Sequence, residues 1–258
     1  MSMEFEMRTL DEGVALVARL RGALRLNLVD RDILERAARE FRAALENPEI
    51  RCVLLSGVDE QAFIGGANLR VLGSLDADTA EGFIRSIHDF CALLREASVP
   101  VIAVLRGHCL GAGLEIAAAC DIRIADQSVV CGMPEVRVGV PSVVEAALLP
   151  GLIGWGRTRE LVLRGHLIGA EEAHAIGLVQ HVTGAADLDA LALTIANDIA
   201  AGAAGALAAQ KRLMLRWEEA GMTAAIEAGV EAFVETYRAG DEPRRYTERF
   251  FARTRKPR

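Results

Sequence analysis

Two stretches of small residues could bring backbone amides close to a ligand. Residues 62–68 and 107–113 each follow a buried apolar segment and lead towards a predicted helix. Ligands of open α/β sheets bind at such places, and small residues let a ligand approach the backbone. The amides of the second stretch lie at a helix start near Leu114, where unpaired N–H groups favour a developing negative charge. The pattern predicts an oxyanion hole, although these glycines could serve only to permit tight turns.

Other chemistries find less support in the sequence. Gly107, Gly111 and Gly113 do not give the G-x-G-x-x-G spacing of a dinucleotide site, and no acidic ribose partner stands out downstream. No His, Cys or Asp cluster has metal-ligand spacing, and no G-x-S-x-G nucleophile elbow occurs. We therefore expect no nicotinamide cofactor, no metal and no covalent serine mechanism.

Alternating strands and helices must position the two stretches. Apolar runs predict strands at 14–18, 52–56, 99–105 and 122–125. Apolar residues at helical spacing predict helices at 33–45, 83–94 and 114–120. This alternation implies crossover connections and a largely parallel sheet covered by helices, which is the α/β class.

The last third of the chain is predicted to be mostly helical. A helix at 170–177, closed by glycine, precedes a last short strand at 178–182. Apolar periodicity then predicts helices at 188–200, 204–219 and 222–239, and we interpret the alanine-rich stretch 200–209 as close-packed helix. The expected organisation is a core at 1–183 and a helical region at 184–258, which caps a pocket or packs on another subunit.

Composition narrows the classes of protein. The net charge of −7 opposes nucleic-acid binding, which normally needs a basic face. Five cysteines form no C-x-x-C pair and lie in apolar stretches, which favours a reducing, cytoplasmic compartment. The acidic N-terminus does not match a signal peptide, and no apolar run approaches the ~20 residues of a membrane helix. We expect a soluble protein.

The run from Gly107 to Asp121, GHCLGAGLEIAAACD, resembles the signature of the crotonase, or enoyl-CoA hydratase/isomerase, superfamily. The resemblance extends to 62–69, 133–136 and 169–179. It implies a core of repeated β-β-α units and a C-terminal helical region involved in trimerisation, often in a hexamer built as a dimer of trimers. It also implies an acyl-CoA substrate, with coenzyme A as part of that substrate and no permanently bound cofactor.

The resemblance assigns roles by position. The amides of Ala67 and Ala112 would hold the thioester oxygen, Glu115 would activate a water, and Glu135 would exchange the α-carbon proton. Without it, Glu115 is an acid that favours the helix dipole and Glu135 a solvated loop carboxylate. The expected contacts with substrate or coenzyme A are Ala62, Gly65, Gly66, Ala67, Asn68, Leu69, Gly111, Ala112, Pro134 and Gly139.

The chain departs from the family pattern at two places. Asn68 stands where many relatives carry Asp, which removes a charge but keeps hydrogen-bonding capacity. Val143, Val144 and Glu145 replace a glycine-rich helix start, which predicts a bulkier acyl pocket. Glu145 is a third carboxylate near the substrate or, as we favour, an acid facing solvent or an intersubunit salt bridge. We leave His108 off the catalytic residues.

Several functions share this scaffold. Glutamates at both positions favour an enoyl-CoA hydratase, whereas a Δ3-Δ2 enoyl-CoA isomerase needs only Glu135. Hydrolases, dehalogenases, decarboxylases and lyases also stabilise an enolate, and a catalytically silent acyl-CoA binder is the non-enzymatic alternative. Lys211, Arg25 and Arg70 are candidates for the phosphates of coenzyme A.

Overall fold

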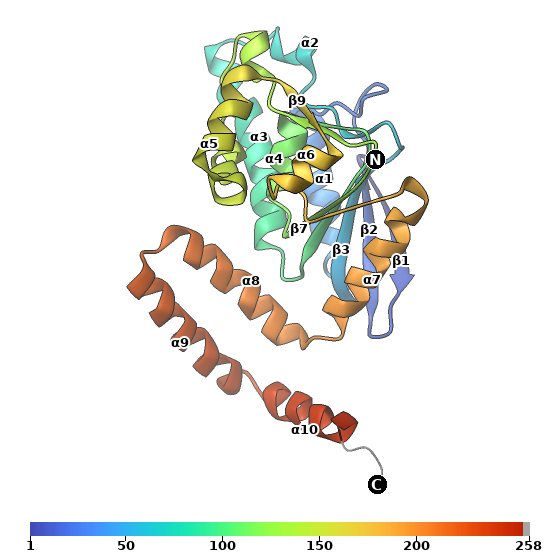
Figure 1. Cartoon of the computed structure of the whole chain (residues 1–258), viewed down its shortest axis with the longest axis vertical. Helices are drawn as coiled ribbons and strands as arrows, with labels where there is room; N and C mark the ends of the chain where they lie inside the picture. Colours follow the sequence, from blue (N-terminus) through green and yellow to red (C-terminus); the bar gives the residue numbers. More distant parts are fainter. Residues whose placement is uncertain (255–258) are drawn as a thin grey trace.

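The computed structural model describes residues 1–254, and its main feature is a six-stranded sheet (Figure 1). Its strands are β1 Met3–Thr9, β2 Val14–Leu20, β3 Ile50–Gly57, β5 Val101–Leu105, β7 Ile122–Asp126 and β10 His181–Thr183. They lie in the order β1-β2-β3-β5-β7-β10. Among the described residues of this sheet, β1 and β2 pair antiparallel and the other neighbouring strands pair in parallel. The prediction of a largely parallel sheet is confirmed.

Strand β1 comes from the acidic N-terminal stretch, for which no strand was predicted. Its acids are stabilised from the neighbouring strand: Glu6 pairs with Arg19 at 2.9 Å, and Glu4 pairs with Arg21. Cross-strand pairs of opposite charge favour an edge strand whose outer face remains in water.

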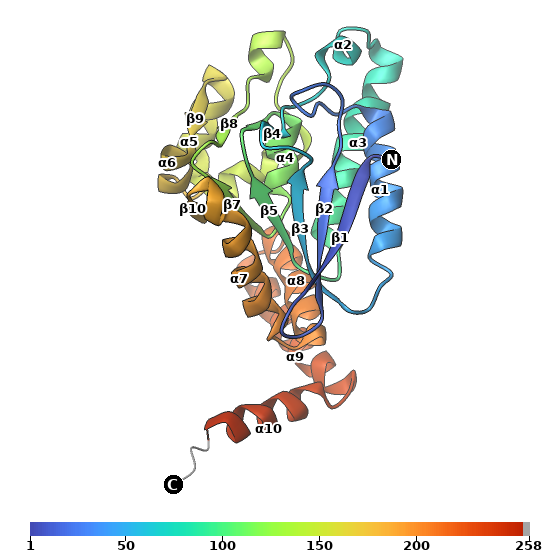
Figure 2. The ribbon, with the colours of Figure 1, turned by 90° about the vertical axis from the view of Figure 1, so that its right-hand side faces the viewer.

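Helices cover both faces of the sheet (Figure 2). Helices α1 (Arg31–Ala44) and α3 (Ala77–Glu96) pack on one face, where Phe41 meets Phe90 edge to face with ring centroids 6.5 Å apart. Helix α7 (Leu188–Ala200) packs on the other face through Leu188, Ala192 and other buried apolar residues. Such buried side chains each stabilise the fold by about 1.5–3 kcal/mol.

A second, four-stranded sheet was not predicted. It consists of β4 Ala62–Ile64, β6 His108–Leu110, β8 Val130–Gly132 and β9 Leu167–Gly169, in that order. The two small-residue stretches were predicted as turns, but each begins with a three-residue strand, because β4 and β6 pair in parallel with each other. Strands this short leave little trace of period-two patterning in the sequence.

Further helices lie along the chain between the elements already named. They are α2 Leu69–Leu72, α4 Ala112–Ala118, η1 Glu135–Val138, η2 Val144–Leu148, α5 Leu149–Arg164, α6 Ala170–Ala175 and η3 Ala185–Asp187. Strand β10 begins three residues later than predicted, because Leu178 and Val179 are buried as non-strand chain before it.

The chain ends in helices α8 (Ala204–Glu219), α9 (Met222–Arg238) and α10 (Glu242–Thr254), of which α9 and α10 extend away from the body (Figure 1). The alanine-rich stretch is not one helix: 185–200 and 204–219 meet at a bend of 103°. Among the described residues, no single helix is long and apolar enough to cross a membrane; only this bent pair would pass, by length and composition.

Candidate active site

The two glycine-containing stretches meet at one edge of the small sheet. Strands β4 and β6 run parallel, so the residues that follow them emerge side by side. A Cβ atom at Gly66 would lie 3.2 Å from the Leu110 carbonyl oxygen, and one at Gly113 would collide with the carbonyl of Ile64. Only glycine at 113 lets the two backbones approach this closely.

The amides of Ala67 and Ala112 lie just beyond these strands. Gly66 and Gly111, which precede them, have φ angles of +113° and +52°, a left-handed backbone that glycine adopts without strain. Within residues 1–254, neither amide donates a hydrogen bond to a protein acceptor. Two free amides at adjacent strand ends suit an anionic oxygen, as the oxyanion-hole hypothesis requires.

Glu115 lies deep in the protein, on the first turn of α4. It is only 4% exposed, and its Oε1 accepts a hydrogen bond from the Ala146 amide at 3.2 Å. Burial, and after it the nearby Glu135 carboxylate, raises the pKa of the Glu115 carboxyl to about 8. This group can hold a proton near neutral pH, unlike an ordinary surface glutamate.

Glu135 is the first residue of η1 and reaches back over the glycine turn. Its Oε1 occupies the space that a side chain on Gly111 would fill, which places the carboxylate beside the start of α4. Its Oε2 accepts a hydrogen bond from the Ser142 hydroxyl at 2.8 Å. Burial raises the pKa of Glu135, and the Ser142 bond opposes that rise.

The structure thus brings both predicted acids to the predicted oxyanion turn. Both carboxyls have raised pKa values, and the charge of Glu135 contributes to the rise at Glu115, so the pair retains a proton at a pH where ordinary glutamates are ionised. Perturbed carboxyls at free backbone amides are typical of acid–base sites.

The other predicted contact residues surround these groups. Pro134 and Gly139 bracket η1, with Gly139 in the left-handed conformation and open space where its side chain would be. Asn68 caps α2 through a 3.2 Å bond from the Arg70 amide, which an uncharged side chain accomplishes as well as Asp. Gly65 packs against Leu26.

Two further contact residues differ in exposure. Leu69 is exposed, whereas Ala62 is fully buried inside β4. Their contact with substrate stays a prediction.

The prediction that Lys211 contacts a phosphate is wrong. Its ammonium is buried and makes an ion pair with Asp121 at 2.6 Å, and it donates to the Leu94 and Val99 carbonyls. These bonds use its three donors to anchor α8 to the core. Arg25 and Arg70 are exposed and remain candidates.

Our favoured interpretation of Glu145 is also wrong. Its side chain is 5% exposed, and Oε1 lies 2.8 Å from Nδ1 of His88. The backbone at Val144 turns the acid inwards between α3 and α4. His88 and Ser142 were both missed, since neither belongs to a motif and His88 lies 57 residues from its partner.

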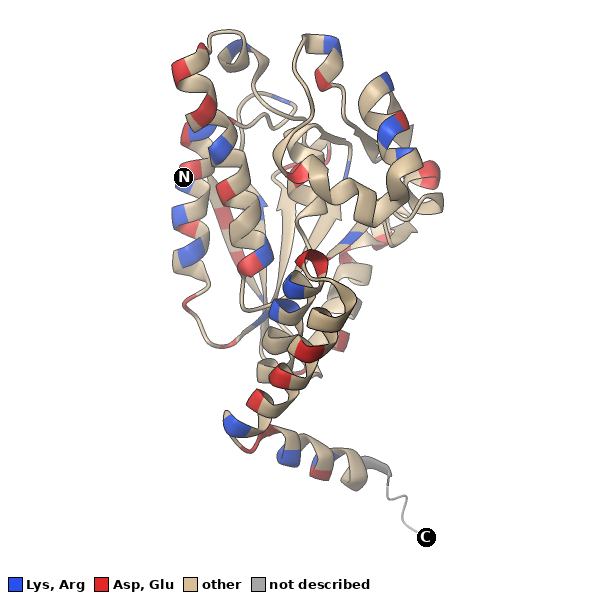
Figure 3. Cartoon of the chain, turned by 90° about the vertical axis from the view of Figure 1, so that its left-hand side faces the viewer, with Lys and Arg blue, Asp and Glu red and all other residues tan. Residues whose placement is uncertain are grey.

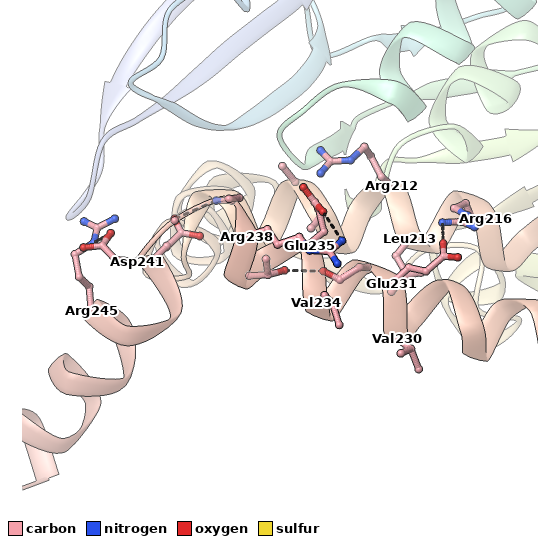
Figure 4. A pocket seen from close by; sticks show the side chains of 18 residues that line it. Arg212, Leu213, Arg216, Val230, Glu231, Val234, Glu235, Arg238, Asp241 and Arg245 are labelled. Atoms are coloured by element: carbon pink, nitrogen blue, oxygen red, sulfur yellow. Dashed lines mark hydrogen bonds and ion pairs between the residues drawn. The ribbon is translucent and has the colours of Figure 1, made fainter.

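A wide groove elsewhere on the chain is a less suitable active site. It lies between α8, α9 and α10, and Figure 4 shows basic and acidic side chains along it together with apolar ones such as Leu213, Val230 and Val234. Arg216 pairs with Glu231 at 3.1 Å and Arg245 with Asp241 at 3.0 Å, and these ion pairs are exposed. Such exposed ion pairs contribute little interaction energy.

Two further properties of the molecule are the distribution of its surface charges and the placement of its potential metal ligands. Basic and acidic residues are interspersed over the outer helices in the view of Figure 3. In the described part of the chain, no group of three or more His, Cys, Asp or Glu side chains is placed to hold a metal ion.

Comparison with known proteins gives the same family that the sequence motif resembles. The family model described as enoyl-CoA hydratase/isomerase matches residues 11–258. A Bacillus subtilis protein, YngF, named for this family, is 42% identical over 156 residues, which is 60% of each chain. A short-chain-enoyl-CoA hydratase of Clostridium acetobutylicum is 30% identical over 90% of this chain and 89% of its own.

The fold has close structural relatives. The crystal structure of an enoyl-CoA hydratase from Bacillus anthracis matches with a TM-score of 0.90 and 26% identity, over 100% of this chain and 98% of that one. The chain therefore belongs to the enoyl-CoA hydratase/isomerase family, and it is an enzyme with the crotonase fold.

Proposed function

We propose that this enzyme is an enoyl-CoA hydratase that adds water in the syn sense across the double bond of a trans-2-enoyl-CoA thioester. The observation that carries the proposal is the pair of interacting acids, Glu115 and Glu135, at the two free amides of Ala67 and Ala112. Hydration delivers a hydroxyl to the β-carbon and a proton to the α-carbon, and two convergent carboxyl groups can perform both transfers.

In the hydration direction, the Glu115 carboxylate takes a proton from water as the oxygen bonds to the β-carbon. The electron pair of the double bond moves into the thioester, and the amides of Ala67 and Ala112 stabilise the enolate oxygen. Glu135 then gives its proton to the α-carbon. Losing one such amide donor costs ~3–4 kcal/mol in other enzymes, so the backbone contributes as much as either acid.

The protonation state of Glu115 in the empty site suits dehydration rather than hydration. Glu115, with a pKa of about 8, holds a proton at neutral pH. Dehydration of a 3-hydroxyacyl thioester needs this state, because the leaving hydroxyl must be protonated. Hydration needs the proton on Glu135 instead, so Glu115 must first release its own.

The other parts of the proposal concern binding. The substrate is the acyl-CoA thioester, and the exposed Arg25 and Arg70 contact the phosphates of its coenzyme A group. No permanently bound cofactor takes part.

We further propose that α9 contacts further copies of the chain in a trimer or hexamer. Met222, Ile226, Val230 and Phe233 recur on one face of this helix, each at least half exposed. Phe233→Glu is expected to reduce the mass measured by light scattering.

Product analysis in heavy-oxygen water separates hydration from isomerisation. A hydratase converts crotonyl-CoA to a 3-hydroxyacyl product that carries one heavy oxygen, seen by mass spectrometry. An isomerase would move the double bond of a 3-enoyl thioester and incorporate no oxygen. A chain that binds the thioester and forms neither product would be a silent binder.

A further inference from the structure

The mechanism does not use Glu145, a buried acid near Glu115. Glu145 is 5% exposed, and its Oε2 is buried without a hydrogen-bond partner among the described residues. Burying a carboxylate oxygen without a partner costs stability, so natural structures rarely retain one without a reason. This oxygen is available to a water or to a neighbouring acid.

Glu145 lies beside the catalytic acid. The next residue, Ala146, donates its amide hydrogen to Glu115 Oε1 at 3.2 Å. The charge of Glu145 also helps to raise the pKa of Glu115. Burial, followed by the charges of Glu145 and Glu115, raises the pKa of the nearby Cys91 thiol. The thiol therefore stays protonated, and the two carboxyls are the groups that can exchange protons here.

The backbone is strained where it delivers Glu145. Val144 has a φ of +38°, which is a rare conformation for a β-branched residue. Such a conformation costs ~1–3 kcal/mol and persists only where the surroundings enforce it. Here it turns the Glu145 side chain inwards, away from the solvent-facing position that the sequence suggested.

The side of Glu145 that faces His88 is connected to solvent. Glu145 Oε1 lies 2.8 Å from His88 Nδ1, and the His88 side chain on α3 is 51% exposed. Glu115, by contrast, is 4% exposed. Glu145 thus contacts the half-exposed His88 on one side and influences the charge of the buried Glu115 on the other.

Hydration creates a need for a proton path between Glu115 and solvent. Each turnover transfers a proton from water to Glu115 and one from Glu135 to the α-carbon. Before the next turnover Glu115 must lose a proton and Glu135 must gain one. Glu135 is only partly buried and can take its proton from solvent.

We propose that Glu145 and His88 form a proton relay that resets Glu115 between turnovers. This inference rests on the proposed hydratase function. Glu115 gives its proton to the free oxygen of Glu145, Glu145 passes a proton to the His88 imidazole, and His88 releases one to water. The net proton change over a cycle is zero. Both residues act through Glu115 and do not touch the substrate.

The relay is tested by comparing the first turnover with steady-state turnover. His88→Gln keeps a hydrogen-bond donor for Glu145 but cannot carry a proton, and Glu145→Gln keeps the shape of the acid. Rapid mixing with enzyme in excess over 3-hydroxybutyryl-CoA measures one turnover of dehydration, which starts from the protonated Glu115 of the empty site. Substrate in excess measures kcat in the same direction, in which the relay runs in reverse and returns a proton to Glu115 after each turnover. His181→Gln, which removes an exposed histidine from β10, is the matched control.

The relay predicts that both variants retain the single-turnover rate within about twofold, while kcat falls roughly 10²-fold, as for the loss of a positioned proton transfer. Added imidazole restores kcat to His88→Ala, and His181→Gln behaves as wild type. An unchanged kcat in His88→Gln overturns the relay. So does an equal fall of both rates, which would mean that the pair only holds η2 in place.

The two levels of the proposal fail in different ways. If wild type leaves every enoyl thioester unchanged, the hydratase function fails and the relay with it. If wild type hydrates the substrate and His88→Gln matches it in steady state, the relay alone fails.

Discussion

Replacing Glu115 with glutamine should make the protein more stable, and increasingly so as the pH rises. The folded protein holds the Glu115 proton up to a pH of about 8, whereas the unfolded chain releases it near the ordinary pKa of 4.5. Wild-type stability from this group is therefore greatest below pH 4.5 and is lost as the pH rises through about 8. Glutamine cannot ionise and avoids this loss.

The pKa change sets the size of the effect. A rise from 4.5 to about 8 corresponds to about 5 kcal/mol in the free energy of unfolding, at about 1.4 kcal/mol for each pH unit. Of this, about 4 kcal/mol falls between about pH 5 and pH 9. The side chain is 4% exposed, so solvent screening reduces the estimate little.

Urea unfolding at a series of pH values, at one protein concentration, measures the difference between the two proteins. The excess stability of Glu115→Gln should grow by about 4 kcal/mol over that range. Glu171→Gln, which removes an exposed acid from α6, is the control and should show no such growth. A constant difference for Glu115→Gln would refute the assignment of a buried acid with a raised pKa.

Three further substitutions test the surroundings of the site. Ser142→Ala removes the bond that opposes the rise in the pKa of Glu135, so the falling alkaline limb of the hydration pH–rate profile should move to higher pH. Gly111→Ala places a Cβ against Glu135 at a φ of +52° and should lower kcat/KM at least about tenfold, measured with crotonyl-CoA. Lys211→Met leaves the Asp121 carboxylate unpaired and should cost ~3–5 kcal/mol in unfolding free energy, much of it recovered by adding Asp121→Asn.

The sequence predicted the parts of the fold that have strong periodicity. The parallel strands β2, β3, β5 and β7 and the helices α1, α3 and α7 follow from apolar runs and helical spacing. Strands β4 and β6 could not be predicted in this way, because they are three residues long and form by pairing with strands that are distant in the sequence. The acidic strand β1 depends on arginines of β2.

The residues of the site also divide into those that a sequence motif predicts and those whose position depends on distant partners. Glu115 and Glu135 belong to a motif whose order and spacing place them at the glycine turns. The burial of Glu145 depends on the conformation of Val144 and on His88, which lies far away in sequence, and general burial preferences gave the wrong result. Lys211 was misassigned for a similar reason, since its partner Asp121 is distant in the chain.

The most direct test of the central claim follows the absorbance of a trans-2-enoyl-CoA thioester during reaction with wild type, Glu115→Gln and Glu135→Gln. We predict that wild type removes the conjugated double bond of crotonyl-CoA and that each substitution lowers kcat by roughly 10²-fold or more. The account would be contradicted if wild type left every enoyl thioester unchanged, or if Glu115→Gln hydrated crotonyl-CoA as fast as wild type.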